Sequence, residues 1–501
     1  MPVVSADPAV LPLPTMPPPQ RAHLVGVCGT GMHGLARLLW DWGWTLSGSD
    51  LQPATVVVES LVQAGLKFHC GHAAEQLPVD ADLLIYSPAI PADNPERRAA
   101  AERGLPQLSY TQMLGRLMQH RSGVCIAGTH GKSTTTAMAA SILSGADWHA
   151  SAIFGAELCD SGLSSWAGTG DLFVVESCEF QRGFWDFAPQ HAAILSVEAD
   201  HFDCFATQDD LLDAFRGFAE RVSPDGVLMV RHEDAGAVEA SRAASAEVLT
   251  FGWTEDADWW AGDVRRSPLG TRFRLFRRGQ FVTELQLPVP GRHNVLNALA
   301  ASALAFEIGV PAATIRGRLQ EFPGIRRRFE RIGSFRGVTL VDDYAHHPTA
   351  VEATLQTARD MYGHRRLVCA FQPHQVSRTQ ALLSDFARSF RLADRVLVAP
   401  VFAARERVRD EPIELSRRLA REIAGQGPSA EFSASLDQLV HVLEDDLRPG
   451  DVLITLGAGD IDRVHHAFTR RILRHSAPRR AVGAVHLDEG GGARTILPHS
   501  A

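Results

Sequence analysis

The feature that most constrains the fold is a stretch in which an apolar strand runs directly into a glycine turn and then a helix. Residues 123–127 read GVCIA and residues 128–134 read GTHGKST. The same order starts at His23, and strand and helix patterns alternate again from residue 338, without a glycine turn after the first strand. Because alternating strands and helices are typical of proteins with parallel sheets, the sequence predicts an α/β fold.

The glycine turn after residue 127 is a candidate phosphate-binding loop. Backbone N–H groups and the helix dipole converge there, which suits a polyphosphate. In such a loop Lys132 would meet the β/γ-phosphates and Ser133 would hold Mg²⁺. The spacing departs from the usual P-loop, whose first glycine would fall at Ile126, so a helix that merely begins with glycines stays an alternative. The predicted nucleotide-binding residues are Gly128, Thr129, His130, Gly131, Lys132, Ser133 and Thr134.

The chain length predicts several domains. At 501 residues it is too long for one hydrophobic core, and ordinary domain sizes suggest about three. We expect a Rossmann-like N-terminal domain over residues 22–118, a central P-loop ATPase domain over 119–323, and a C-terminal Rossmann-like domain over 324–475. The proline-rich residues 1–21 and the glycine-rich residues 476–501 are expected to be disordered tails.

Composition excludes several classes of function. A formal charge of −9 argues against a general nucleic-acid binder, which would carry a basic excess. No apolar run approaches the ~20 residues needed to cross a bilayer, so no membrane insertion is expected. The seven cysteines form no CxxC pair, which disfavours a disulfide framework and a zinc site and predicts a cytoplasmic location.

A second glycine turn, GTGMHG at residues 29–34, matches G-x-G-x-x-G after the first predicted strand. Asp50 lies near the distance expected of a ribose-binding acid. A nicotinamide dinucleotide, a UDP sugar and a merely tight strand–helix turn are all compatible with this pattern.

Two side chains follow apolar strands that should end beside the phosphate loop. Glu176 ends LFVVE, and His201 follows AILSV within ADHFD. Because the carboxyl ends of parallel strands converge, this carboxylate and imidazole are candidates to complete a Mg²⁺ shell. Ordinary charges on a surface loop are the alternative.

The segment GRHNVLNALAA, residues 291–301, begins a long apolar helix. The spacing favours Asn294 as the N-cap. Recognition of adenine or ribose by the amides of Asn294 and Asn297 is the alternative.

Two polar clusters follow predicted strands of the third unit, VDDYAHHPT at residues 341–349 and FQPHQVSRT at residues 371–379. A single histidine is more often structural, but two clusters at equivalent strand ends indicate a site. The candidate residues are Asp343, Tyr344, His346, His347, His374 and Arg378.

Taken together, nine motifs in order over about 440 residues resemble the Mur ligase family, and within it the members that add L-alanine to UDP-N-acetylmuramic acid. The motifs are GVCGTGMHG, AGTHGKSTTT, VVESCEF, ADHFDCF, GRHNVLNALAA, IRRRFE, VDDYAHHPT, FQPHQVSRT and LGAGDI.

The resemblance implies an ATP-dependent amide ligase of peptidoglycan precursor synthesis. ATP would phosphorylate the carboxylate of UDP-N-acetylmuramic acid, and the amine of L-alanine would attack the acyl phosphate. The N-terminal domain would bind the UDP sugar, the central domain ATP and Mg²⁺, and the C-terminal domain the amino acid. The chain would be a monomer or a homodimer.

The resemblance also assigns roles residue by residue. Lys132, Glu176 and His201 would be catalytic, with Ser133, Glu176 and His201 holding the metal. Arg328 would join Asn294 and Asn297 in contacting the nucleotide. The candidates facing the UDP sugar are Gly29, Thr30, Gly31, Met32, Asp50 and Ser87, and those facing the amino acid come from the two C-terminal clusters.

The sequence departs from the family pattern at three places. The acidic motif E-A-D-E-S-D reads ESCEFQ at residues 176–181, so two carboxylates are missing. Cys28 replaces a glycine, as in the related ligase that recycles L-alanyl-γ-D-glutamyl-meso-diaminopimelate onto the same UDP sugar. Gln375 and Val376 stand where the alanine-adding members usually have Arg and Tyr.

Three alternatives therefore stay open. The tripeptide-recycling ligase shares the nucleotide and the chemistry but uses a different amine. A nicotinamide-dependent dehydrogenase would explain GTGMHG but leaves AGTHGKST unexplained. A nonenzymatic UDP-sugar sensor would keep the N-terminal site and lose ATP turnover.

Overall fold

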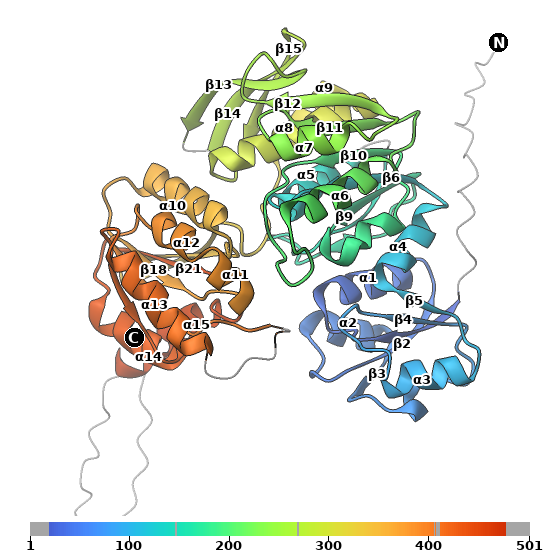
Figure 1. The fold of residues 1–501 in the computed structure, drawn as a ribbon, viewed down its shortest axis with the longest axis horizontal. Coiled ribbons are helices and arrows are strands. Elements are labelled where there is room, and N and C mark those ends of the chain that lie inside the picture. The colour runs from blue at the N-terminus through green and yellow to red at the C-terminus, as the bar shows by residue number, and fades with distance from the viewer. Residues whose placement is uncertain (1–19, 146–147, 268–269, 405, 407–410, 477–501) are drawn as a thin grey trace, which may run out of the picture.

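The computed structural model describes residues 20–476 except 146–147, 268–269, 405 and 407–410. The two predicted tails therefore lie almost entirely outside the described residues. Three separate sheets follow one another along the chain, each with helices on its faces (Figure 1). The predicted α/β fold is confirmed. No helix in the described ranges is both long and apolar enough to cross a membrane.

The first unit is a parallel sheet with the strand order β3-β2-β1-β4-β5. The predicted helix is present but begins at Thr30, inside the GTGMHG segment, with Gly29 as its N-cap. The strands are β1 (Arg21–Val25), β2 (Thr45–Asp50), β3 (Lys67–Cys70), β4 (Leu83–Tyr86) and β5 (Gln107–Ser109), and the helices are α1 (Thr30–Asp41), α2 (Val56–Ala64), η1 (Ala74–Gln76), α3 (Pro95–Glu102) and α4 (Tyr110–Met118).

The central unit has a larger, mixed sheet in the order β15-β14-β13-β12-β11-β10-β6-β9-β7-β8. Its strands are β6 (Ser122–Ala127), β7 (Ser151–Ile153), β8 (Ser165–Trp166), β9 (Leu172–Ser177), β10 (His191–Ile194), β11 (Val227–Arg231), β12 (Glu247–Gly252), β13 (Trp259–Ser267), β14 (Gly270–Arg277) and β15 (Gln280–Leu287). Its helices are α5 (Lys132–Leu143), η2 (Phe180–Asp186), α6 (Gln208–Ala219), α7 (Ala235–Ser241), α8 (Arg292–Ile308) and α9 (Ala312–Gln320).

The antiparallel strands β13, β14 and β15 extend the central sheet and were not predicted. Their sequence does carry the strand signal: Phe273 and Leu275 are buried while Arg272 and Arg274 are exposed, an alternation with period two. The predicted helix near residue 294 is present as α8 and packs against α5.

The third unit has a six-stranded sheet among the described residues, in the order β16-β17-β21-β18-β19-β20, in which β16 is antiparallel to β17. The strands are β16 (Glu330–Phe335), β17 (Val338–Asp343), β18 (Leu367–Phe371), β19 (Arg395–Val398), β20 (Ser429–Phe432) and β21 (Val452–Leu456). The helices are α10 (Pro348–Tyr362), α11 (Val376–Ala381), α12 (Leu383–Ser389), α13 (Glu411–Ala424), α14 (Leu436–Asp446) and α15 (Arg463–Ser476).

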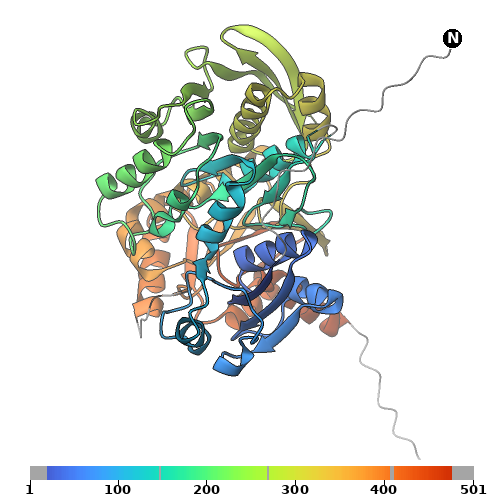
Figure 2. The ribbon, with the colours of Figure 1, turned by 90° about the vertical axis from the view of Figure 1, so that its right-hand side faces the viewer.

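In Figure 1 the central unit lies above the other two, with the orange-to-red third unit at the lower left and the blue first unit at the lower right, and Figure 2 shows the same molecule from the side. One apolar cluster runs continuously from the first unit into the central one and includes both Leu35 and Phe173. The two apolar clusters of the third unit contain no residue before Phe329 among those described. The third unit therefore meets the central unit without sharing a core.

Candidate active site at the junction of three units

A cavity of about 810 Å³ opens where the three units meet. Thr30 of the first unit, Lys132 of the central unit and Arg378 of the third unit all line it. Strands β6, β9 and β18 end at the cavity, and the loops that follow them supply this part of the lining. The structure thus brings together candidate residues that lie up to hundreds of positions apart in the chain.

The phosphate loop requires glycine at two positions. Gly128 has φ +138° and Gly131 has φ +80°, a region that side chains rarely adopt. A Cβ on Gly131 would lie 2.5 Å from Asn297 Oδ1, and one on Gly128 would lie 2.9 Å from the Ser196 nitrogen. The loop is therefore packed tightly against β10 and α8, which places Asn297 beside it as predicted.

Lys132, the first residue of α5, points back into the loop. Its Nζ donates to Gly128 O at 2.5 Å and to both oxygens of Glu179, at 2.9 and 3.1 Å. Burial alone would lower the pKa of Lys132, but the Glu179 carboxylate outweighs burial and raises it. Burial would raise the pKa of Glu179, yet Lys132 and His201 lower it to about 2. Lysine and carboxylate are therefore both charged.

Ser133 and Glu176 form the oxygen pair expected of a Mg²⁺ site. Ser133 Oγ donates to Glu176 Oε1 at 2.9 Å, and the Gly155 N–H donates to Glu176 Oε2 at 2.5 Å. Hydroxyl and carboxylate oxygens suit Mg²⁺. His201 Nδ1 is buried with no hydrogen-bond partner among the described residues, which leaves it available to a ligand. The donor set fits a divalent cation.

His201 lies beside Glu179, an acid that was not among the predicted site residues. Its Nε2 is 3.5 Å from Glu179 Oε1, and although burial lowers the pKa of His201, hydrogen bonding to Cys178 and Glu179 raises it to about 10, so His201 would have to lose a proton before it could hold a cation. One ligand atom from each of Cys178, Glu179 and His201 lies within 4.8 Å of the others. Glu179 is thus one of the two carboxylates that remain in a motif from which two are missing.

Asn294 does not cap its helix, so the cap interpretation is wrong. The N-cap of α8 is Gly291, whose φ of +102° suits glycine, and Asn294 lies inside the first turn. Its Nδ2 donates to Pro290 O at 2.6 Å, and its Oδ1 accepts from Asn297 Nδ2 at 3.1 Å. The paired amides line the cavity, as does Arg328, whose guanidinium lies 5.0 Å from the Tyr344 ring centroid.

His130 and His347 approach each other across the boundary between the central and third units. Their ring centroids are 4.8 Å apart, and His130 Nε2 is 2.7 Å from Glu198 Oε2. Thr349 Oγ1 donates to the other oxygen of Glu198 at 2.7 Å. Burial would raise the pKa of Glu198, but hydrogen bonds from His130 and Thr349 lower it to about 2.

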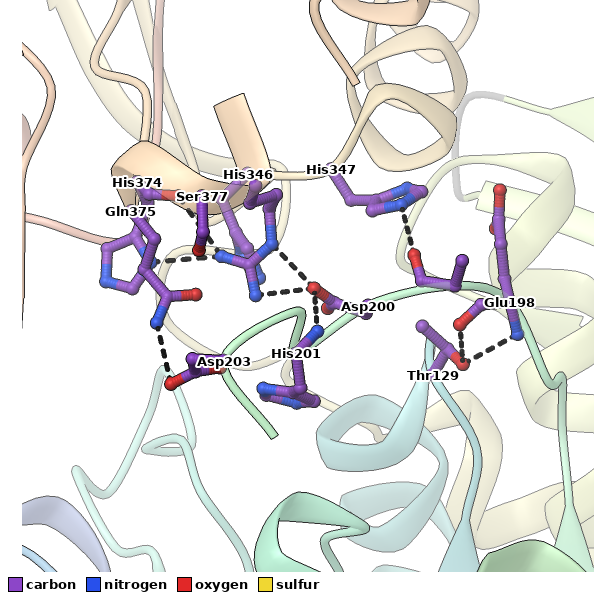
Figure 3. Close-up of polar contacts among 12 residues, drawn as sticks. Thr129, Glu198, Asp200, His201, Asp203, His346, His347, His374, Gln375 and Ser377 are labelled. Carbon is purple, nitrogen blue, oxygen red and sulfur yellow. Dashed lines mark hydrogen bonds and ion pairs between the residues drawn. The ribbon is translucent and has the colours of Figure 1, made fainter. Parts of the chain in front are cut away.

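The cluster on the third unit is organised around Arg378, which is 2% exposed. His374 Nδ1 is 3.1 Å from Arg378 Nη1, and the rings of His346 and His374 lie 5.7 Å apart. His346 Nδ1 donates to Tyr344 O at 2.9 Å, and burial followed by the Arg378 charge lowers the pKa of His346 well below its usual value. His346 is therefore a neutral imidazole. Asp200 of the central unit completes the cluster (Figure 3).

Asp343 lines the cavity while Met32 lies in the apolar core, and their substrate contacts stay predictions. Both Asp343 oxygens accept backbone N–H groups, from Ala345 at 2.8 Å and from Phe329 at 2.7 Å, so this carboxylate holds its own loop. The Met32 side chain is 2% exposed and belongs to the apolar core. It cannot reach a sugar nucleotide without leaving that core.

The remaining first-unit candidates lie around the GTGMHG turn. Asp50 Oδ2 accepts from the Cys28 N–H at 2.8 Å, so Asp50 braces the turn. Gly31 faces Tyr110, whose ring would lie 3.0 Å from an added Cβ. Ser87 follows β4, and its N–H donates to Val25 O at 3.0 Å. Gly29, the N-cap of α1, and Thr30, its first residue, complete the turn.

Three charged residues of this site were missed in the sequence: Glu179, Glu198 and Asp200. Each lies within three positions of a residue that was identified, Glu176 or His201. Their proximity to a strand end was the available signal. What the sequence lacked was any indication of their partners, which are Lys132, Thr349 and Arg378.

Family profiles match the chain in three consecutive segments. Residues 21–122 match the profile described as "Mur ligase family, catalytic domain". Residues 126–305 match "Mur ligase middle domain", and residues 327–459 match "Mur ligase, glutamate ligase domain".

Curated relatives match across nearly the whole chain. The UDP-N-acetylmuramate--L-alanine ligase of Caldanaerobacter subterraneus subsp. tengcongensis is 38% identical over 451 residues, 90% of this chain and 97% of that protein. The protein of the same name from Acidithiobacillus ferrooxidans is 39% identical over 447 residues, 88% of this chain and 96% of that one.

Two solved structures are also similar. The UDP-N-acetylmuramate-alanine ligase of Thermotoga maritima has 27% identity and a TM-score of 0.77, covering 91% of this chain and 100% of its own. A murein peptide ligase of Psychrobacter arcticus has 26% identity and a TM-score of 0.67, covering 90% of this chain and 98% of its own. The resemblance noted in the sequence is confirmed by each comparison: this chain belongs to the Mur ligase family.

Proposed function

We propose that the protein is an ATP-dependent ligase that joins L-alanine to UDP-N-acetylmuramic acid in the synthesis of peptidoglycan precursors. One observation carries the proposal: the phosphate loop around Lys132 and the cationic cluster around Arg378 face the same cavity from different units. Relatives bearing that activity in their names match about nine-tenths of the chain at 38–39% identity.

The reaction balances in two steps. The carboxylate oxygen of UDP-N-acetylmuramic acid attacks the γ-phosphorus of ATP, and ADP leaves. The amine nitrogen of L-alanine then attacks the acyl phosphate carbon, the amine gives up a proton, and phosphate leaves with the electrons of the C–O bond. Amide formation is thus driven by the conversion of ATP to ADP and phosphate.

The residues of this chain contribute charge and position. Lys132 is held charged by Glu179 and directed at the loop that receives the phosphates, where a cation stabilises the charge developing on the transferred group. Ser133, Glu176 and His201 are the residues that would hold Mg²⁺, which would add further charge neutralisation when bound. Arg378 would face the acceptor carboxylate, since a guanidinium suits that group.

Phosphate release tests the proposal directly. ADP and phosphate should appear only when Mg²⁺, ATP, UDP-N-acetylmuramic acid and an amino acid are all present, and mass spectrometry should find UDP-N-acetylmuramoyl-L-alanine. Omission of each component in turn provides the controls. Hydride transfer to NAD without ATP consumption would rule out the proposal, and so would ATP turnover independent of the UDP sugar.

A second candidate is the ligase that attaches the L-alanyl-γ-D-glutamyl-meso-diaminopimelate tripeptide to the same UDP sugar. Cys28 in the first turn and the likeness to the Psychrobacter arcticus enzyme favour it. Competition between alanine and the tripeptide at equal concentration, with both products quantified, decides between the two acceptors.

We also propose a cytoplasmic location, where both nucleotide substrates would be found, and a monomer or homodimer in solution. Fractionation of cells and light scattering of the purified protein test these two statements.

A further inference from the structure

A single loop of the central unit, residues 198–203, reaches across to the third unit (Figure 3). The contacts come from four positions of the loop and end at the starts of two helices of the third unit, α10 and α11. They are Thr349 Oγ1 to Glu198 Oε1 at 2.7 Å, His347 Nε2 to Ala199 O at 3.3 Å, Arg378 Nε to Asp200 Oδ1 at 2.6 Å, and Gln375 Nε2 to Asp203 Oδ2 at 3.4 Å. The same loop carries His201.

The pair formed by Asp200 and Arg378 differs from the other contacts in charge and burial. Nε and Nη2 of Arg378 both lie 2.6 Å from Asp200 Oδ1. The two side chains are 6% and 2% exposed. The other contacts use a hydroxyl, an amide or a backbone oxygen. This ion pair is therefore the one charged, buried link among the contacts of the loop with the third unit in the described chain.

The orientation of Arg378 depends on groups from both units. Its Nη1 lies 3.2 Å from His374 O and 3.1 Å from His374 Nδ1, within its own unit. Its other edge is directed by Asp200, which belongs to the central unit. A buried guanidinium without its carboxylate carries a large desolvation cost. Arg378 can therefore keep this buried position only while the third unit is docked on the loop.

Both members of the pair line the large cavity, so the contact lies at the site rather than behind it. Asp200 Oδ1 also accepts from the His201 N–H at 2.7 Å. The carboxylate of Asp200 therefore contacts both the Arg378 side chain and the backbone of His201, the residue proposed as a metal ligand.

We propose that Asp200 is the positioning residue for Arg378: it holds the guanidinium at the wall of the cavity that receives the acceptor amino acid, so that the amino-acid site is complete only when the third unit is docked. This inference rests on the proposed function. It goes further by making acceptor binding depend on a residue of the ATP-binding unit. Alanine affinity is then coupled to docking, whereas the first unit binds its sugar independently.

The Asp200→Asn variant tests the inference because it keeps the size of the side chain and removes its charge. The apparent KM for alanine is expected to rise by about tenfold or more, as for loss of one partner from a buried charged pair. The KM values for ATP and the UDP sugar should stay within about twofold. Asp200→Glu retains the carboxylate and should recover part of the alanine affinity.

Thr349→Val is the matched control. It breaks another contact between the same loop and the same unit, that of Thr349 with Glu198, without touching Arg378. The rise in the alanine KM of this variant measures the effect of weaker docking alone. If Asp200→Asn raises the alanine KM no more than Thr349→Val does, Asp200 supports docking only and the positioning role is overturned.

The outcomes separate this inference from the proposed function. If the wild-type protein forms no amide product with any amino acid, the proposed function is wrong. If the wild type forms product and Asp200→Asn keeps its alanine KM, the function stands and the inference is wrong. Should Asp200→Asn fail to fold, as judged by circular dichroism, Asp200→Glu decides: an alanine KM equal to the wild-type value, with the guanidinium displaced by the longer side chain, overturns the inference.

Discussion

The two interfaces of the central unit are built from different interactions. Toward the first unit the contact is apolar: Trp42 and Phe173 meet edge to face with centroids 6.1 Å apart inside one continuous core. Toward the third unit the contact is polar, and the ion pair of Asp200 with Arg378 is its most buried part. No apolar cluster spans this second interface in the described ranges.

The difference between the two interfaces indicates which units can move relative to each other. Separating an apolar core exposes area at a cost of roughly 25 cal/mol per Å², so the first and central units should move as one body. Polar groups that leave an interface recover hydrogen bonds with water, and such interfaces open more readily. The ligand carried by the third unit is therefore the one whose binding should depend on docking.

The largest expected effect comes from Lys132→Ala, which should abolish turnover, a loss of about a thousandfold or more in kcat. UDP-sugar binding, measured by calorimetry, should stay nearly intact because the sugar and the ATP phosphates are assigned to different units. Equal loss of sugar binding would contradict that assignment.

A control is needed because Lys132→Ala leaves the buried Glu179 with only His201, at 3.5 Å, as a charged partner among the described residues, and breaking a buried ion pair costs about 3–5 kcal/mol. The double variant Lys132→Ala, Glu179→Gln removes that charge as well. It should regain thermal stability and remain inactive, which separates the loss of chemistry from the loss of folding.

The next largest effect tests the apolar interface. Phe173→Ala should lower the free energy of unfolding by about 3–5 kcal/mol, because Phe173 is fully buried where the first and central units meet. Urea unfolding followed by tryptophan fluorescence should show the first and central units unfolding together, earlier than in the wild type.

Phe371→Ala provides the matched comparison, since Phe371 is equally buried but packs against Phe386 and Phe390 within the third unit. Phe371→Ala should lower the free energy of unfolding of the third unit alone.

The opposite result for Phe173→Ala would contradict a shared core. It would consist of two separate unfolding transitions for the first and central units, with the wild type unchanged.

Mild acid should open the polar interface. Burial, followed by the His130 charge, lowers the pKa of His347 from its ordinary 6.5 to about 4, although Glu198 and Asp200 oppose the shift. An exposed imidazole in the open form binds a proton more readily. The docked form is therefore fully favoured above pH 6.5 and loses up to about 3 kcal/mol as the pH falls from 6.5 toward 4.

Fluorescence energy transfer between labels on the central and third units, recorded from pH 7.5 to 5, measures this opening. His347→Asn should flatten the pH response. His465 offers a control because its Nε2 contacts groups of its own unit, Thr455 Oγ1 at 2.8 Å and Val341 O at 3.1 Å, and burial also lowers its pKa to about 4. His465→Asn should leave the distance profile unchanged, and a profile identical in all three proteins would remove His347 from the argument.

The sequence predicted what is local and missed what is assembled. The phosphate loop was predictable because strand, glycines and helix are consecutive, and the structure shows that Gly131 cannot be replaced without meeting Asn297. The link between Asp200 and Arg378 joins positions 178 apart, and no spacing rule connects them. In the sequence Asp200 and Arg378 are two ordinary charged residues, and they become partners only where the central and third units meet.

Two errors have particular causes. Asn294 was interpreted as a cap because asparagine favours that position, but Gly291 takes it with a positive φ that glycine tolerates at no cost. Glu179 was overlooked because the acidic motif was judged by its missing carboxylates. Burial makes the remaining one more important, since a nearly inaccessible Glu179 charge needs Lys132 as its partner.

The smallest expected effect concerns the choice of acceptor. We predict that L-alanine is preferred and that glycine and L-serine react more slowly, because a methyl-sized pocket discriminates by only ~1–3 kcal/mol. Arg378→Ala should raise the alanine KM far more than Gln375→Ala does. The Gln375 amide contacts Asp203, at 3.4 Å, so Gln375 contributes to the interface between the central and third units.

Initial rates with alanine, glycine, serine and the alanyl-glutamyl-diaminopimelate tripeptide, at saturating ATP and UDP sugar, decide the acceptor.

The comparison of interfaces adds a condition: variants that weaken docking should raise the KM of every acceptor by a common factor, since docking precedes recognition of the side chain. Discrimination between alanine and glycine should survive in them. If Asp200→Asn instead removes the discrimination between alanine and glycine, the pair of Asp200 with Arg378 shapes the methyl pocket. Docking and acceptor selectivity then depend on the same contact. A faster rate with the tripeptide would assign the protein to the recycling reaction.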